Sequence, residues 1–191
     1  MRSLFIITLF CLCLTNCKSK TDKNTKTDPT TSHTKTSKNN STTYLSVELN
    51  PKNDSNVSGK VRFIQSGDLV KMTAKVVGLS KGVHAIHIHE KSDCSAPDGK
   101  SAGGHWNPTA QPHGKWGDES GYHKGDIGNF LVQDQKITVF DFSTNQWCIG
   151  CGDATKDLLG KAVIIHQGED DFVSQPSGAA GSRVSCAGII E

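Results

Sequence analysis

The sequence predicts an all-β fold: an eight-stranded Greek-key sandwich or flattened barrel with two long functional loops. From residue 44 onward, short runs rich in β-branched and aromatic residues alternate with segments of Gly, Asn and Asp. No stretch has the apolar periodicity of an amphipathic helix. The 191 residues allow one domain with a proper core, and many short antiparallel strands with one buried face pack as a sandwich or a barrel.

Eight segments have the composition of strands and are bounded by turn residues. In chain order they are residues 44–49, 59–65, 69–79, 83–89, 130–133, 136–142, 161–166 and 183–190. Two connections are far longer than the turns between strands, residues 90–125 and 167–182. Long loops in a compact domain usually carry function, so we expect both to contribute to the functional site.

Residues 1–17 are expected to be a signal peptide. Arg2 is followed by the apolar run SLFIITLFCLCL, which is too short to span a membrane and leads directly into polar sequence. The end of this run, Leu-Thr-Asn-Cys17, resembles a bacterial lipoprotein cleavage signal, in which the cysteine is acylated and becomes the new N-terminus. Asn16 departs from the small residue usual before that cysteine, so a cleaved secretory signal with an unmodified Cys17 is the alternative.

Residues 18–43 are expected to be a flexible polar linker that precedes the domain at residues 44–191. The linker contains no large apolar residue, so it cannot bury enough surface to offset the entropy of ordering. Its six lysines and two aspartates give it a net charge of +4, and Arg2 adds one more. The formal +2 of the whole chain therefore leaves −3 for the domain, and we expect no nucleic-acid partner.

A strand with three histidines begins the candidate metal site. In VHAIHIH, successive side chains point to opposite faces, so the two isoleucines lie on one face while His87 and His89 lie on the other. If the isoleucines face the core, both histidines can reach one ion. In isolation, two surface histidines would be the simpler interpretation. His84 falls on the isoleucine face and is expected to be a buried, hydrogen-bonded support.

The other histidines and one aspartate complete two sets of four ligands that share one ring. Three histidines and a carboxylate suit a closed tetrahedral zinc site. The members of this set are His105, His113, His123 and Asp126. Four imidazole nitrogens suit copper in a flattened geometry. The members of that set are His87, His89, His105 and His166. His105 is thus expected to bridge the two metals.

With these motifs the domain resembles the copper/zinc superoxide dismutase family over about residues 44–191. The matching motifs, in the family's order, are GLSKGVHAIHIHE, AGGHWNP, HKGDIGN, GKAVIIH and GSRVSCAGII. Several motifs in order are far more specific than any one of them. The resemblance implies an enzyme that disproportionates superoxide to dioxygen and hydrogen peroxide, with copper as the redox metal and zinc as its structural partner.

The resemblance also implies roles for single residues. The copper histidines and Arg183 would be catalytic, with Arg183 guiding the anion to the open copper position. Asp170 would link a copper histidine to a zinc histidine and orient both rings. Cys94 and Cys186 would form the family disulfide. The alternatives are a surface charge at Arg183, a solvated acid at Asp170 and two free thiols.

Two features depart from the family pattern. Cys148-Ile-Gly-Cys151 has no counterpart that we recognise, and we expect a local disulfide or spare thiols rather than a redox motif or half a metal site. The second long loop, residues 167–182, is short and lacks the lysines that steer superoxide in many members. Steering is therefore expected to rest on Arg183 and the metal charges, with Lys91 or Lys124 as further candidates.

The sequence thus predicts an exported superoxide dismutase in the periplasm or cell envelope, touching a membrane only through a lipid anchor on Cys17. The even number of cysteines in the domain, four, favours disulfides and an oxidising compartment. The alternative function is a non-enzymatic copper- and zinc-binding module of the same fold, against which the completeness of the copper set argues. The oligomeric state stays open, a homodimer included.

Overall fold

A computed structural model describes residues 41–134 and 136–191. The predicted signal peptide, the candidate lipidation site Cys17 and all but the last three residues of the predicted linker lie outside the described residues. Within the described ranges, the structure has no helix of the length and apolarity needed to cross a membrane.

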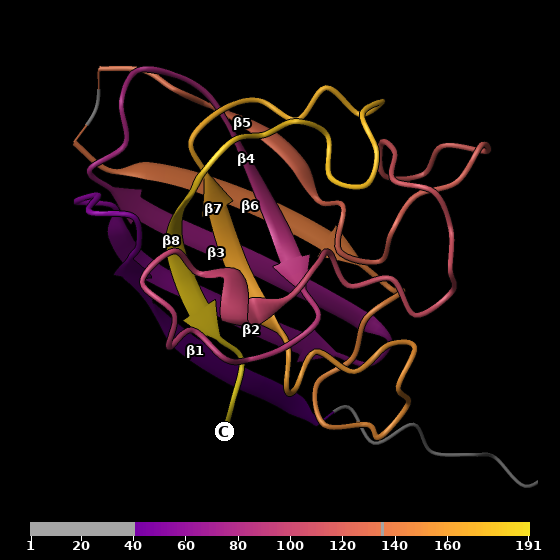
Figure 1. The fold of residues 1–191 in the computed structure, drawn as a ribbon. Helices are drawn as coiled ribbons and strands as arrows, with labels where there is room; N and C mark the ends of the chain where they lie inside the picture. Colours follow the sequence, from indigo (N-terminus) through magenta and orange to yellow (C-terminus); the bar gives the residue numbers. More distant parts are fainter. Residues whose placement is uncertain (1–40, 135) are drawn as a thin grey trace, which may run out of the picture. The chain divides into compact units, whose positions relative to one another are not determined.

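The described residues form eight strands and one short 3₁₀ helix (Figure 1). In chain order these are β1 (Thr42–Pro51), β2 (Ser58–Ser66), β3 (Leu69–Val77), β4 (Gly82–His89), the 3₁₀ helix η1 (Lys100–Ala102), β5 (Gly128–Val132), β6 (Thr138–Thr144), β7 (Ala162–His166) and β8 (Arg183–Gly188). The predicted all-β, eight-stranded fold is confirmed.

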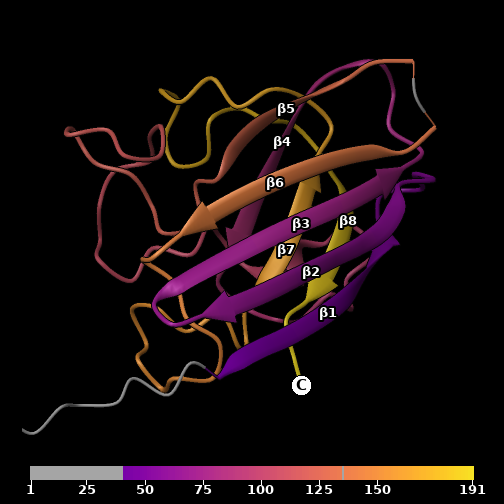
Figure 2. The ribbon, with the colours of Figure 1, turned by 180° about the vertical axis from the view of Figure 1, so that it is seen from behind.

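The strands follow one another in the order β5-β4-β7-β8-β1-β2-β3-β6, all antiparallel, and curl into a nearly closed barrel of two layers. The layers join where Asn50 and Pro51 of β1 pair with Cys186 and Ser185 of β8. Figure 2 shows the β1-β2-β3-β6 layer in front of the other layer. Because β3 pairs with β6 and β4 with β7, connections cross between the layers, as in a Greek key.

The core fills the space between the two layers. Along β2 and β3, alternate side chains such as Phe63 and Met72 are buried, because one face of this layer is solvated. In β4 and β7 nearly every residue is buried, because loops cover the outer face. Ile86 and Ile88 join the core, as the alternation predicted, which leaves the histidines of β4 on the opposite face beneath the loops.

The observed strand ends differ from the expected ones by a few residues. β1 begins at Thr42 because Thr42 and Thr43 continue the ladder with the end of β2. β5 begins at Gly128, which pairs with Ile86 of β4. Thr42 and Thr43 end a long polar stretch and Gly128 is a turn residue, so composition favoured a loop at both places, but the pairing partner decides the boundary.

Two disulfides lie among the described residues, and they close loops of very different length. Cys94–Cys186 joins residues 92 positions apart and ties the start of the first long loop to β8. Cys148–Cys151 spans three positions within the loop between β6 and β7. Cross-linking removes more entropy from the unfolded chain when the closed loop is longer.

Removing the two disulfides separately should therefore give unequal losses of stability. On the chain-entropy model, Cys94→Ala/Cys186→Ala should lower the free energy of unfolding by roughly 4–5 kcal/mol, and Cys148→Ala/Cys151→Ala by roughly 1–2 kcal/mol. Urea unfolding of metal-free samples at one pH measures both. Equal losses in the two double variants would contradict this explanation.

Candidate metal centre

Seven buried side chains gather beneath the loops as two donor groups that share His105. In each group the potential ligand atoms lie within 4.8 Å of one another. The first group is His87, His89, His105 and His166, here called the copper-side group after the metal expected there from the sequence. The second is His105, His113, His123 and Asp126, called the zinc-side group for the same reason. These are the two sets predicted from the sequence, and the structure brings every member together.

Backbone pairing fixes where the two groups meet. His87 and His89 come from β4, and His166 ends the neighbouring strand β7. The first long loop is pinned onto β4: the amide of Trp106 donates to the carbonyl of Ile88 at 2.8 Å, and the amide of Ile88 donates to the carbonyl of Gly125 at 2.9 Å.

This close approach explains the glycine in the HKGD turn. A Cβ atom at Gly125 would lie 2.0 Å from the carbonyl oxygen of Ile88 and 2.9 Å from the amide nitrogen of Trp106. Only a residue without a side chain fits at that distance. The turn therefore holds His123 and Asp126 against β4, beside His105.

On the copper side, four ring nitrogens converge without protons between them. The Nδ1 atoms of His89 and His166 lie 3.0 and 3.4 Å from the carbonyl oxygens of Gly103 and Gly181, so these nitrogens carry the ring protons. Their Nε2 atoms then face each other as lone pairs at 3.4 Å. The Nδ1 of His87 and the Nε2 of His105 are buried without a hydrogen-bond partner. Such a cluster of buried lone pairs is suited to a cation.

On the zinc side, three rings turn their Nδ1 atoms toward one carboxylate. Oδ1 of Asp126 lies 2.8 Å from Nδ1 of His105 and 3.2 Å from Nδ1 of His123, and Oδ2 lies 3.0 Å from Nδ1 of His113. The Nδ1 atoms of His113 and His123 have no partner in hydrogen-bonding geometry. Three nitrogens and one carboxylate at these distances have the composition of a tetrahedral zinc site.

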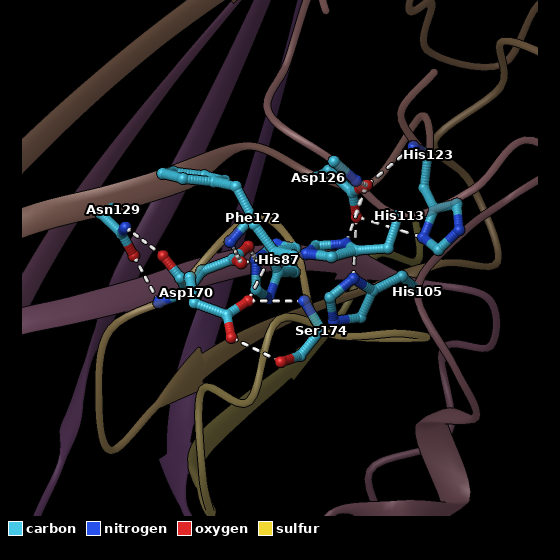
Figure 3. A network of polar contacts seen from close by, with 12 residues as sticks. His87, His105, His113, His123, Asp126, Asn129, Asp170, Phe172 and Ser174 are labelled. Atoms are coloured by element: carbon cyan, nitrogen blue, oxygen red, sulfur yellow. Dashed lines mark hydrogen bonds and ion pairs between the residues drawn. The ribbon is translucent and has the colours of Figure 1, made fainter. Parts of the chain in front are cut away.

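The carboxylate of Asp170 links the copper-side group to the zinc-side group through one hydrogen bond to each. Its Oδ2 accepts a hydrogen bond from Nε2 of His87 at 2.8 Å, and its Oδ1 accepts one from Nε2 of His113 at 2.9 Å. With Nε2 donating to Asp170, each ring turns its Nδ1 toward its own donor group. The side chain of Asn129 grips the main chain of Asp170 through two hydrogen bonds of 2.8 and 2.9 Å. Figure 3 shows Asp170 between Asn129 and these histidines, and Asp126 facing His105 and its neighbours.

Burial and the carboxylates push the pKa values of the two groups in opposite directions. Burial lowers the pKa of His105 to about 4 and holds those of His89 and His166 well below the ordinary value, so these three rings are neutral. Burial also lowers the pKa of His113, but the adjacent carboxylates of Asp126 and Asp170 outweigh it and raise the pKa to about 9. In the metal-free protein His113 therefore carries the charge that a cation would replace.

A surface cavity of about 370 Å³ opens beside the copper-side group. His89, His166, Pro176, Ser177 and Arg183 are among its lining residues. The guanidinium of Arg183 donates to the carbonyl oxygens of Gly99 and Gly103 at 2.8 and 2.7 Å, which fixes its planar group at the cavity. The steering candidate Lys124 instead donates to the side chain of Gln146.

Two other predicted features lie outside this site. His84 is buried, and its ring nitrogens lie 3.1 and 2.9 Å from the carbonyl oxygens of His166 and Ser80, so it supports the strand, as predicted. Cys148 and Cys151 share a disulfide near Asp157, whose carboxylate accepts hydrogen bonds from three backbone amides. This third cluster therefore braces a loop.

Sequence reasoning missed Asn129 and Gln175. Asn129 lies inside the HKGDIGN motif, where an amide directly after the ligand turn was an available signal. Gln175 donates to the carbonyl oxygen of His113 and accepts from its amide, both at 2.9 Å. These residues are 62 positions apart in the chain, so no local pattern could have indicated the contact.

Comparison with known proteins agrees with this geometry. The sequence model of the family described as "Copper/zinc superoxide dismutase (SODC)" matches residues 57–189. The chain belongs to this family. The resemblance predicted from the motifs is therefore confirmed.

Among curated members of the copper/zinc superoxide dismutase family, superoxide dismutase [Cu-Zn] 2 of Aquifex aeolicus is 37% identical over 139 residues, which cover 70% of this chain and 79% of that protein. An extracellular superoxide dismutase [Cu-Zn] of Caenorhabditis elegans is 36% identical over 137 residues, 69% of this chain and 60% of that one. The chain thus spans about three fifths of the Caenorhabditis protein.

Solved structures of a SOD-like protein from Bacillus subtilis share the fold. One, of the protein without substitutions, has a TM-score of 0.68 at 28% identity and covers 76% of this chain and 98% of that chain. Another, a double mutant with histidine introduced at two positions, has the same TM-score at 30% identity and covers 76% of this chain and 97% of that one.

The pKa shifts predict opposite pH limits for the stability of the metal-free protein. His113, with its pKa raised to about 9, contributes stability that is fully present below its ordinary pKa of 6.5 and is lost as pH rises through 9. His105, with its pKa lowered to about 4, makes stability fall as pH drops from 6.5 toward 4. Urea midpoints across this range should decline on both sides, and His113→Gln should remove the decline toward pH 9. The same high-pH decline in that variant would refute the assignment.

Proposed function

We propose that this protein is a superoxide dismutase that converts superoxide to dioxygen and hydrogen peroxide at copper bridged to zinc through His105. The observation that carries the proposal is the position of one buried ring in both donor groups. Nδ1 of His105 lies 2.8 Å from the carboxylate of Asp126, while its Nε2 is buried without a partner on the copper side. Family membership and the names of the relatives, copper–zinc superoxide dismutases, support the activity.

The donor atoms follow from which nitrogens already have partners. Copper would be held by Nδ1 of His87 and by the Nε2 atoms of three histidines, namely His89, His105 and His166. Zinc would be held by the Nδ1 atoms of His105, His113 and His123 together with Asp126. When bound, copper supplies the one-electron redox chemistry and zinc, which has none, supplies fixed charge.

His105 has to lose its last ring proton to present both nitrogens at once. Its pKa, lowered to about 4 by burial, keeps the ring neutral at physiological pH, and adjacent cations favour the further deprotonation. Whenever its Nε2 is free, that atom can hold a proton and pass it to reduced substrate. His105 would thus serve both as a metal ligand and as a proton donor.

Arg183 is the residue placed to bind the anion. Its guanidinium is held at the cavity by two backbone carbonyls, which leaves further N–H donors for a charge-assisted hydrogen bond to superoxide. Residues 44–191 have a net charge of −3, so attraction of an anion has to come from this local group and the metals rather than from total charge.

A non-enzymatic metal-binding module is the second candidate. The observation in its favour is that the solved relatives from Bacillus subtilis are called SOD-like, so the fold does not by itself specify the activity. Against it stand a complete set of four copper-side histidines and an arginine at the same cavity. A relic of an enzyme would be expected to lack one of these.

Export is part of the proposal. Two disulfides lie among the described residues, as expected of a protein folded in an oxidising compartment. The Caenorhabditis elegans and Haemonchus contortus relatives are named extracellular. Acylation of Cys17 would then hold the domain to a membrane of the cell envelope.

His166→Ala tests the dismutase proposal. The intact protein loaded with copper and zinc should contain about one of each per chain and dismutate superoxide. The variant should lose turnover at least a hundredfold and lose copper, because one of four donors is gone, while it keeps zinc, whose donors are untouched. Elemental analysis and a superoxide assay measure both. Stoichiometric metal without turnover in the unmodified protein would favour the binding module.

Arg183→Gln tests the anion site. Loss of a charge-assisted hydrogen bond should lower kcat/KM by roughly tenfold to a hundredfold and weaken inhibition by azide, while copper content is unchanged. Arg183→Lys keeps the charge but not the planar guanidinium, so its kcat/KM should lie between those of the wild type and Arg183→Gln. If Arg183→Gln retained full activity and full azide sensitivity, the assigned role would be wrong.

A further inference from the structure

The loop between β7 and β8, residues 167–182, touches both donor groups. It begins directly after His166 and ends directly before Arg183. Within it, Asp170 accepts hydrogen bonds from rings of the copper side and of the zinc side. The loop is also folded tightly against that carboxylate, because a Cβ atom at Gly178 would lie 1.8 Å from Oδ1 of Asp170.

Gln175 makes a second, separate connection from this loop to the zinc side. Its Oε1 accepts a hydrogen bond from the amide of His113, and its Nε2 donates to the carbonyl of the same residue, both at 2.9 Å. A side-chain amide paired with both main-chain groups of one residue fixes separation and orientation together. Gln175 itself is exposed, so burial does not explain its conformation.

The residues that follow Gln175 form part of the cavity wall. Pro176 and Ser177 line the cavity together with His166 and Arg183. The main chain closes on itself around them, since the amide of Gly178 donates to the carbonyl of Ser174 at 2.7 Å. A shift of Gln175 would therefore move Pro176 and Ser177 relative to the copper-side group.

We propose that Gln175 is a positioning residue that fixes the wall of the copper-side cavity to the main chain of His113. Zinc held by Nδ1 of His113 thereby also holds that wall, and the wall in turn restrains His113. The two metal sites are then coupled by this amide, in addition to the shared ring of His105 and the carboxylate of Asp170. This inference rests on the proposed metal sites and deepens the proposed function.

Gln175→Ala tests the role with two measurements that need no superoxide. In the copper- and zinc-loaded full-length protein, loss of both hydrogen bonds to His113 should speed transfer of zinc to an excess of chelator roughly tenfold. It should also change the dissociation constant of azide, measured from the visible spectrum of the copper site, at least threefold. Gln175→Glu keeps the acceptor and loses the donor, so its zinc transfer rate should lie between those of the alanine variant and the wild type.

Val173→Ala is the matched control. Val173 lies in the same loop, is 76% exposed, and accepts a hydrogen bond from Gln175 through its main-chain carbonyl, which the substitution keeps. The control should leave zinc transfer and azide binding unchanged. If Gln175→Ala matched the wild type within twofold in both measurements, or if Val173→Ala gave the same changes, the inference would be overturned.

These measurements test the positioning role of Gln175 separately from the proposed dismutase activity. Zinc transfer and azide binding report on the metal sites whether or not the protein turns over superoxide. An inactive protein in which Gln175→Ala still releases zinc faster would reject the dismutase and keep the positioning role. If the protein is active and Gln175→Ala changes neither measurement, the dismutase proposal stands and the positioning role is rejected.

Discussion

The arrangement depends on one constraint, that the buried imidazole of His105 belongs to two donor groups at once. A buried ring can serve both only if every neighbouring ring is already oriented. The structure meets this requirement with backbone carbonyls on the copper side, which fix the tautomers of His89 and His166, and with Asp170, which orients His87 and His113. The outer ring nitrogens then hold these hydrogen bonds, and the other nitrogen of each ring points inward.

The barrel supplies the rigidity that this constraint demands. Alternation along β4 sends isoleucines into the core and histidines beneath the loops, so the packing of the core and the position of the ligands are set by the same backbone. The loops add the other ligands only because they are pinned to β4, most closely at Gly125. A site on irregular segments thus acquires the precision of the strands beneath it.

Much of this could be predicted from sequence because the signals are local. The eight strands, the two-residue alternation that separates His87 from Ile88, and the spacing of His123 and Asp126 are all visible within short windows. Strand ends were less predictable, because pairing partners rather than composition decide them. The contact of Gln175 with His113 was beyond reach, since it joins two loops whose approach depends on the folded barrel.

The carbonyl oxygen of Gly103 accepts two hydrogen bonds, one from a histidine of the copper-side group and one from the arginine at the cavity. The carbonyl of Gly103 accepts a hydrogen bond from Nδ1 of His89 at 3.0 Å and another from the guanidinium of Arg183 at 2.7 Å. Gly103 has a φ of 76°, and a Cβ atom there would lie 2.5 Å from Cγ of Glu90, so a larger residue at this position would be strained. A change that moves this carbonyl would therefore alter the basicity of the His89 ring and the position of the Arg183 guanidinium together, because a single peptide unit holds both.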